Sequence, residues 1–153
     1  MEIRHRILVL SDSHGHNLSN LLMKARSMGE ADAVLHAGDG CRDLEPYRSG
    51  LPDIYQVLGN CDLFPAAGEL CFELFKKRFL LCHGHRYQVK STMSLLEDRA
   101  HEVGADVCVF GHTHVPFNEY KNGVLYLNPG AAWDGHFSVL LMLADGTLYP
   151  RMY

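Results

Sequence analysis

The sequence predicts an α/β fold, and the order of its elements would suit two packed sheets with helices outside them. In the first half of the chain, strand-like and helix-like stretches alternate, which is typical of βαβ units and parallel strands. In the second half, short strand-like runs are separated by turn sequences, which is typical of antiparallel hairpins. Five of the strand-like runs also end on aspartate, asparagine or histidine beside a glycine or another small residue.

The first half predicts three strands and a helix, at residues 6–10, 18–28, 33–36 and 54–58. Apolar residues at helical spacing predict the helix, with Asn17 placed to cap it and Gly29 to end it. Because a strand, a helix and a second strand follow one another, the sheet is at least partly parallel. Residues 41–50 predict a short helix or loop, and residues 63–68 predict a loop.

The second half predicts one helix, one further strand and three hairpins. The helix spans about residues 91–103 and ends at Gly104. A strand at residues 107–110 follows it, and the turn of the next hairpin is marked by Asn122 and Gly123. The hairpins pair residues 71–75 with 78–82, 117–120 with 124–127, and 138–143 with 147–149.

Length and composition define the class of protein. The chain has 153 residues, and we expect one domain over residues 1–153 with a substantial core. Its hydrophobic content of 47% and charged content of 21% are ordinary for a globular protein. Its net charge of -4 argues against a broad surface for binding nucleic acid.

The expected cellular compartment is inferred from the lack of membrane and signal segments and from the cysteines of the sequence. No apolar run reaches the length of a transmembrane helix, and no signal peptide is visible. The five cysteines form no C-x-x-C pair, which fits a reducing compartment better than a disulfide scaffold. We therefore expect a cytoplasmic protein with no membrane partner, and we leave open whether it forms a homo-oligomer.

Polar residues follow five of the predicted strands at the point where each strand ends. They are Asp12 and His14, Asp39, Asn60, His83 and His85, and His112 and His114. Ligands bind at the carboxyl ends of strands in α/β sheets, so five such ends can converge on one site. The alternative is five unrelated turns that are polar because turns generally are; we favour a composite metal site.

Seven of these residues offer oxygen or nitrogen to a metal: Asp12, His14, Asp39, Asn60, His83, His112 and His114. A single structural zinc needs fewer ligands and usually prefers cysteine and histidine. The mixed set therefore suggests two metal ions with one carboxylate bridging them. A calcium or storage site would carry more carboxylates, whereas two dications held by two carboxylates keep positive charge and attract a phosphate.

Six motifs occur in a fixed order: Asp12-x-His14, Gly38-Asp39, Gly59-Asn60-Cys61-Asp62, His83-Gly84-His85, Gly111-His112-x-His114 and Asn128-Pro129-Gly130. Together they resemble the calcineurin-like metallophosphoesterases, and in particular the small single-domain phosphodiesterase branch of bacteria and archaea. The resemblance runs from about Ile7 to Gly130. It implies a four-layer α/β/β/α sandwich of two mixed sheets, with a dinuclear site at the strand ends.

The resemblance also implies two overlapping sets of ligands that share Asp39 as a bridge. One metal would be held by Asp12, His14, Asp39 and His114, and the other by Asp39, Asn60, His83 and His112. The expected catalytic residues are Asp39, Asn60 and His83, and the expected substrate contacts are Asn60 and His85. Plain solvent exposure is the alternative for His85. Manganese is the first expectation for both ions, with iron, zinc or nickel as alternatives.

The expected function is that of a dinuclear metal-dependent phosphodiesterase. A hydroxide bridging the two metals would attack a small phosphodiester substrate without a covalent enzyme intermediate. One alternative is a phosphomonoesterase or protein phosphatase acting at the same site. Another is a non-catalytic scaffold protein of the same fold, such as the retromer subunit that has lost part of the site. Because the chain is short and every ligand position is filled, we favour the small phosphodiester.

Three positions depart from the resemblance or have no assigned role. Larger members of the family have a histidine after the motif asparagine, which is thought to act on the leaving group, whereas this chain has Cys61. Relatives often have serine after the Asn-Pro-Gly turn, whereas this chain has Ala131. Trp133 could stack on an aromatic or base group of the substrate, or it could pack within its own loop.

Overall fold

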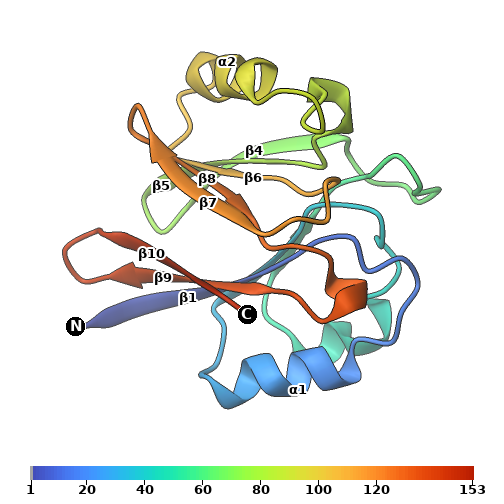
Figure 1. The fold of residues 1–153 in the computed structure, drawn as a ribbon. Coiled ribbons are helices and arrows are strands. Elements are labelled where there is room, and N and C mark those ends of the chain that lie inside the picture. The colour runs from blue at the N-terminus through green and yellow to red at the C-terminus, as the bar shows by residue number, and fades with distance from the viewer. Residues whose placement is uncertain (1) are drawn as a thin grey trace.

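Two five-stranded sheets lie face to face in the molecule (Figure 1). The computed structural model describes residues 2–153. The first sheet contains β1 (Ile3–Leu10), β2 (Ala33–His36), β3 (Ile54–Gln56), β9 (Ser138–Leu143) and β10 (Leu148–Met152), in the order β10-β9-β1-β2-β3. Its strands β1, β2 and β3 are parallel, whereas β9 is antiparallel to both β1 and β10.

The second sheet contains β4 (Glu69–Leu74), β5 (Lys77–Cys82), β6 (Val107–Val109), β7 (Phe117–Lys121) and β8 (Val124–Asn128), in the order β4-β5-β6-β8-β7. The central strands β5, β6 and β8 are parallel. The edge strands β4 and β7 are antiparallel to their neighbours. Both sheets are therefore mixed, as predicted.

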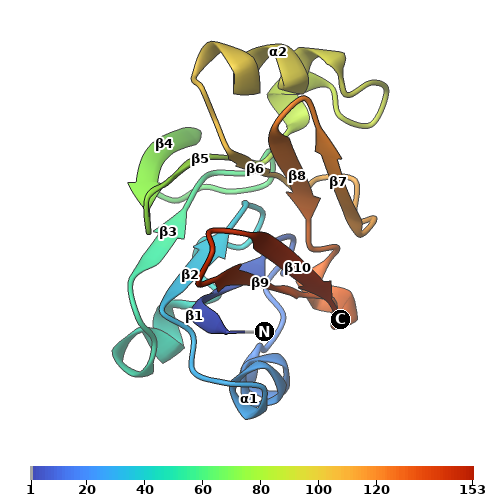
Figure 2. The same cartoon turned by 90° about the vertical axis from the view of Figure 1, so that its left-hand side faces the viewer.

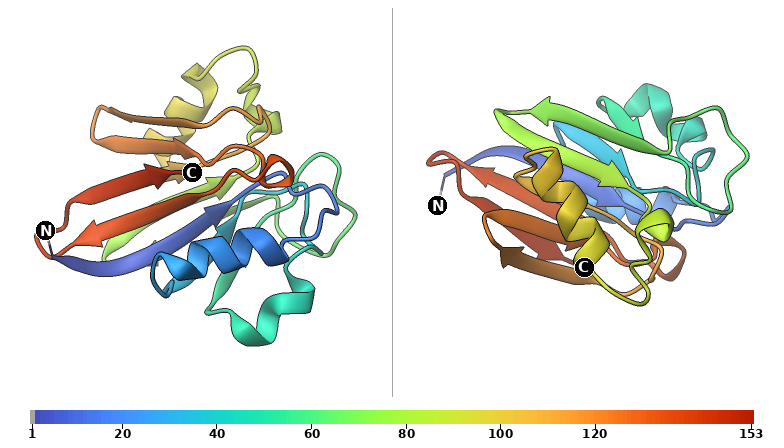
Figure 3. Two further views of the ribbon diagram at one scale, coloured as in Figure 1. Left: turned by 60° about the horizontal axis from the view of Figure 1, so that its bottom comes forward. Right: turned by 90° about the horizontal axis from the view of Figure 1, so that it is seen from above.

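A helix covers the outer face of each sheet. The helix α1 (Ser19–Ser27) lies outside the first sheet and α2 (Ser94–Glu102) lies outside the second (Figures 1 and 2). Seen from above, α2 runs across the second sheet (Figure 3). Three short 3₁₀ helices complete the chain: η1 (Glu45–Gly50), η2 (His85–Tyr87) and η3 (Ala132–Asp134). These layers confirm the predicted α/β/β/α sandwich.

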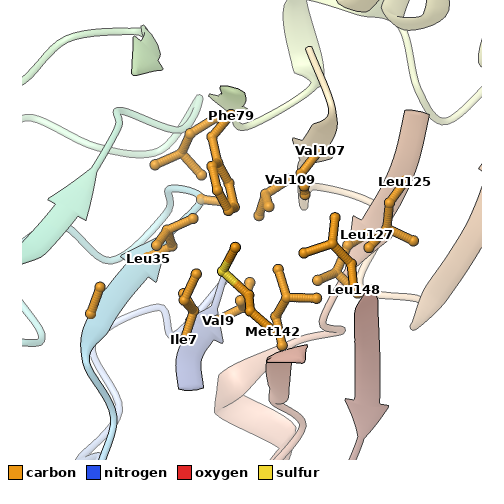
Figure 4. Close-up of a cluster of buried hydrophobic side chains, with 14 of the residues drawn as sticks. Ile7, Val9, Leu35, Phe79, Val107, Val109, Leu125, Leu127, Met142 and Leu148 are labelled. Carbon is orange, nitrogen blue, oxygen red and sulfur yellow. The ribbon is translucent and has the colours of Figure 1, made fainter. Parts of the chain in front are cut away.

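The strand β1 shows how alternating side chains build the layers. Successive residues of a strand point to opposite faces of its sheet. Ile7 and Val9 enter the hydrophobic cluster between the two sheets, which Figure 4 shows in close-up. Leu8 and Leu10 point the other way and pack in a cluster with Leu21 of α1.

Within residues 2–153, no helix is long and apolar enough to cross a membrane.

Several element boundaries differ from the sequence-based prediction because of local hydrogen bonds. The helix α2 begins later than predicted, since the chain before it turns and the Ser91 N–H donates to the Gln88 carbonyl. The strand β3 ends before Leu58, whose N–H donates across the loop to the Ala67 carbonyl. The strands β1 and β10 are longer than predicted, because both pair along their length with β9.

Candidate metal centre

The predicted ligands follow the carboxyl ends of strands in both sheets. The ends of β1, β2, β5 and β6 are followed by Asp12, Asp39, His83, and the pair His112 and His114. The loops that hold residues 11–18, 57–68 and 129–137 gather on the right-hand side of Figure 1. Backbone hydrogen bonds join the segments that follow neighbouring strands: the Asp12 N–H donates to the Gly38 carbonyl at 2.9 Å, and the Gly111 N–H donates to the His83 carbonyl at 2.9 Å.

A first group of side chains brings together Asp12, His14 and His114. The Oδ1 atom of Asp12 lies 3.5 Å from His14 Nε2 and 3.2 Å from His114 Nε2. The two imidazole nitrogens are 3.3 Å apart. Residues more than a hundred positions apart in the chain thus meet at one point, and their atoms are of the kinds that hold a divalent cation.

A second group brings together Asp39, His83 and His112. The Nε2 atom of His83 lies 3.3 Å from Asp39 Oδ2 and 3.2 Å from His112 Nδ1. The two groups adjoin each other, because Asp39 Oδ2 also lies 3.8 Å from His14 Nε2 and Asp12 Oδ1 lies 3.7 Å from His83 Nε2. Both carboxylates therefore stand between the two histidine groups.

The Oδ1 atom of Asp12 is buried and has no hydrogen-bond donor within residues 2–153. The other oxygen of the same carboxylate accepts hydrogen bonds from Ser11 Oγ at 2.6 Å and from the His112 N–H at 3.0 Å. Burying a carboxylate oxygen without a hydrogen-bond partner destabilises the folded state. Three imidazole nitrogens surround this oxygen, so the donor set fits a divalent cation.

The ring of His83 is oriented by the backbone of the first sheet. Its Nδ1–H donates to the Ala37 carbonyl at 2.8 Å, which leaves Nε2 free to face Asp39. A hydrogen bond of this kind fixes the tautomer of a ligating histidine and the direction of its lone pair.

Charges within the centre shift the pKa values of Asp39 and His83 in opposite directions. Burial acts to raise the pKa of Asp39, but hydrogen bonds from His83 and the Cys61 N–H outweigh it and hold this pKa well below its usual range. Burial likewise acts to lower the pKa of His83, but the hydrogen bond to Asp39 and the charge of Asp12 raise it. The centre therefore keeps the Asp39 carboxylate ionised and favours positive charge beside it, whether a proton on His83 or a cation.

Backbone strain is concentrated in this centre. Nine non-glycine residues within 2–153 have a positive φ, and five of them are predicted ligands: Asp12, His14, Asp39, His112 and His114, with φ between 47° and 69°. Such conformations are sparsely populated by non-glycine residues and cluster at functional sites.

Two glycines beside the ligands leave space that a side chain would fill. A Cβ atom on Gly59 would lie 2.0 Å from Asp39 Oδ1, and one on Gly111 would lie 1.9 Å from Ser11 Oγ. Both contacts are shorter than real Cβ atoms allow. The glycines of the motifs are therefore required by close approach and not by turn geometry alone.

Two of the predicted site residues stand apart from these groups. Asn60 is exposed, and its Nδ2 lies 3.6 Å from Cys61 Sγ; within residues 2–153 its side chain makes no hydrogen bond to another predicted ligand. His85 is half-buried, and its ring lies 5.4 Å from that of His83 and 6.0 Å from that of His112. Its Nδ1 is buried without a hydrogen-bond partner, and burial lowers its pKa.

Two residues that the sequence analysis left without a role organise the loops. Asp62 accepts hydrogen bonds from the N–H groups of Asp39 at 2.7 Å, Gly59 at 2.8 Å and Gly40 at 2.9 Å. Asn128 donates from Nδ2 to the Gly111 carbonyl at 3.1 Å. Aspartate and asparagine side chains commonly form hydrogen bonds with the backbone of turns. The positions of Asp62 after Gly-Asn-Cys and of Asn128 before Pro-Gly could therefore have indicated this role.

Comparisons with known proteins find a family model and a relative that match most of the chain. Residues 6–145 match a family model described as the calcineurin-like phosphoesterase superfamily domain. The Bacillus subtilis protein named probable metallophosphoesterase YsnB is 36% identical over 129 residues, which cover 82% of this chain and 73% of that protein.

Solved structures give the same result for the fold. A protein from Streptococcus pneumoniae, described as a predicted phosphoesterase, aligns over 97% of both chains with a TM-score of 0.75 and 27% identity. Vacuolar Protein Sorting 29 from Cryptosporidium parvum aligns over 99% of this chain and 98% of its own, with a TM-score of 0.80 and 20% identity. The second likeness is one of fold alone.

Proposed function

The chain belongs to the calcineurin-like phosphoesterase superfamily, and on this premise we propose that it is a phosphodiesterase acting on a small phosphodiester with two divalent cations. The observation that carries the proposal is Asp12 Oδ1, a buried carboxylate oxygen with no hydrogen-bond donor and with three imidazole nitrogens within 3.2–3.7 Å. Within residues 2–153 no group donates a hydrogen bond to that oxygen, whereas a cation shared with the imidazoles would bind it.

The proposed ligands form the two sets that the motifs predict. The first cation would be held by Asp12, His14, Asp39 and His114, and the second by Asp39, Asn60, His83 and His112. Asp39 suits the bridging role because Oδ1 already accepts the Cys61 N–H at 2.8 Å, while Oδ2 faces both histidine groups. Manganese is our first choice for these oxygen and nitrogen ligands, ahead of iron, zinc and nickel.

The chemistry that bound divalent cations supply is the acidification of water and the neutralisation of phosphate charge. Neighbouring residues of the protein fix the orientation of the proposed ligands. The Ala37 carbonyl fixes the ring of His83, and the Cys61 N–H fixes the carboxylate of Asp39. Asn60, as a neutral ligand, leaves more positive charge for the phosphate than a carboxylate would. His85, with its unpartnered Nδ1, is proposed to contact the substrate.

The substrate is proposed to be small. A cavity of about 500 Å³ borders the centre, and its lining includes His14, Asp39, Cys61, Arg42 and Phe64. That volume is in the range of pockets for small molecules. A non-catalytic role is the second candidate, since the fold is also that of Vacuolar Protein Sorting 29. The clustered ionisable side chains support a catalytic role instead.

Metal analysis combined with a substrate screen tests the proposal. Manganese-loaded protein should carry about two ions per chain and should hydrolyse at least one class of phosphodiester faster than the matching monoester. Asp39→Asn should lose both ions and the activity, because its carboxylate lies between the two histidine groups. Asp134→Asn, an exposed carboxylate nearby, is the matched control and should change neither.

Two outcomes would contradict the proposal. A limit of one ion per chain with full activity would exclude the two-cation scheme. Fully loaded protein that hydrolyses no diester or monoester in the screen would favour the non-catalytic role.

A further inference from the structure

Trp133 is the single tryptophan of the chain, and it lies at the rim of the metal centre. It belongs to η3, and 44% of its surface is exposed, so it does not serve as a core residue. Large aromatic side chains left open beside a polar site are a common means of binding planar ligands.

The backbone holds Trp133 against the segment that carries the first ligand. The Trp133 N–H donates to the Asp12 carbonyl at 3.2 Å, and the neighbouring Ala132 N–H donates to the Ser11 carbonyl at 2.8 Å. The indole N–H donates to His114 Nδ1 at 3.4 Å, and the two rings meet edge to face with centroids 6.4 Å apart. The indole is thus placed directly beside a ligand of the first group.

A second ring extends the same surface. The centroid of the His16 ring lies 5.9 Å from that of Trp133, with 39° between the planes. The His16 ring is itself held, because its Nδ1 lies 3.1 Å from the Ser13 carbonyl. Trp133 and His16 therefore form a fixed aromatic pair at the rim, which we name the aromatic platform.

The aromatic platform and the large cavity border different ligands of the centre. The cavity is lined by His14, Asp39 and Cys61, whereas Trp133 contacts His114, so the two surfaces adjoin at the pair His14 and His114. A phosphodiester carries two organic groups on one phosphorus, and two separate surfaces beside the phosphate position could take one group each. The resemblance described above implies a histidine that acts on the leaving group at the position of Cys61, so the departing group is placed toward Cys61 and the retained group toward Trp133.

We propose that the aromatic platform binds a planar aromatic ring on the ester group that stays on the phosphate. This inference rests on the proposed phosphodiesterase function and specifies its substrate class: diesters whose retained group is an aryl or nucleobase-bearing one. The physical basis is stacking on the open face of the indole, which tolerates any ring with a π face. Trp133 is then a specificity-determining residue and not a ligand.

The test uses two diesters with one leaving group and different retained groups. Both p-nitrophenyl phenyl phosphate and p-nitrophenyl ethyl phosphate release nitrophenolate, so the departing oxygen is the same. Manganese-loaded protein should show a kcat/KM about tenfold higher for the phenyl compound, the size expected of one stacking contact. Trp133→Leu should abolish that preference mainly through KM, Trp133→Phe should keep most of it, and His16→Ala should reduce it.

Tyr149→Leu is the matched control, because Tyr149 is an aromatic residue of similar exposure on β10 and should leave the preference unchanged. Fluorescence gives a second measurement that needs no turnover. Phenyl phosphate should quench the emission of Trp133 in the loaded protein, whereas ethyl phosphate at the same concentration should not.

The possible failures are distinguishable. If the protein hydrolyses both diesters and Trp133→Leu slows both equally, the platform is wrong and the proposed function stands. If it hydrolyses neither of these two compounds and no other diester or monoester of the screen, the proposed function fails. The platform is then decided by fluorescence, where equal quenching by both phosphates, or none by either, would overturn it.

Discussion

Among single residues, we expect His83 to govern how cation binding responds to pH. Its pKa is raised by the hydrogen bond to Asp39 and the charge of Asp12, against the opposing effect of burial. A proton on Nε2 excludes a cation, so cation affinity should fall as pH falls through this raised pKa and should be full above it. We expect cation affinity and activity to rise from mildly acidic to mildly alkaline pH, measured by metal competition and initial rates.

The control for this pH dependence is His101→Gln, an exposed histidine on α2 whose loss should not change the profile. An activity that peaks at about pH 5, below the ordinary pKa of histidine, would contradict the scheme.

Cys61 is one of the positions at which the sequence departs from the resemblance described above. Its Sγ lies within 4.8 Å of ligand atoms of His14 and Asp39, and burial and the charge of Asp39 raise its pKa, which disfavours a nucleophilic thiolate. We therefore expect Cys61→Ala to change turnover little, and esters with acidic leaving groups to be preferred.

The informative variant is Cys61→His. General acid catalysis typically contributes about 10²–10⁴-fold to a rate. A histidine directed at the departing oxygen should therefore reduce the difference between the hydrolysis rates of nitrophenyl and alkyl diesters. This difference is measured from the hydrolysis rates of both ester classes in the wild type and in Cys61→His. Loss of turnover in Cys61→Ala with both ions still bound would instead give the thiol a direct role.

At the scale of elements, the turn after β6 depends on the absence of a side chain at Gly111. A Cβ there would lie 1.9 Å from Ser11 Oγ and 2.6 Å from Asp12 Oδ2, so it must displace the hydrogen bond between these two groups. Gly111→Ala should weaken cation binding about 10- to 100-fold, the usual cost of disturbing a group that orients a ligand. Gly50→Ala is the matched control, because a Cβ at Gly50 meets nothing within 4 Å.

Isothermal titration of both variants with manganese measures this effect. Equal affinity in Gly111→Ala and Gly50→Ala would mean that the turn after β6 relaxes without moving Asp12.

At the scale of the whole molecule, the centre joins the two sheets. Asp12, His14 and Asp39 follow strands of the first sheet, whereas His83, His112 and His114 follow strands of the second. Cations bound between them would cross-link the sandwich and stabilise only the folded state. At a free concentration of 100 times Kd, one such ion adds about 2.7 kcal/mol to the free energy of unfolding.

Thermal unfolding measures this stabilisation. For a chain of this size, about 2.7 kcal/mol corresponds to a rise in Tm of roughly 5–10 °C. Asp39→Asn should show no rise with manganese, and its own Tm without added metal serves as the reference. A wild-type Tm that does not respond to manganese would mean that the cations do not bridge the sheets.

The sequence by itself determined the fold class and the family. Alternating strand and helix patterns in the first half, and hairpin signals such as Asn122-Gly123 in the second, are local properties that a short window of residues contains. The polar residues at strand ends are local too, and the direction of parallel strands places them at one edge. A resemblance in ordered motifs then sufficed to indicate the family.

Only the tertiary structure decided how these residues meet. The distance of 3.0 Å between the His112 N–H and Asp12 Oδ2 joins residues 100 positions apart, and it depends on how the two sheets pack. The same packing leaves Asp12 Oδ1 without a donor and places Trp133 beside His114. The exposure of Asn60 and its contact with Cys61 Sγ also come from the folded loop. Such contacts arise from the packing of distant segments, which no local pattern of residues encodes.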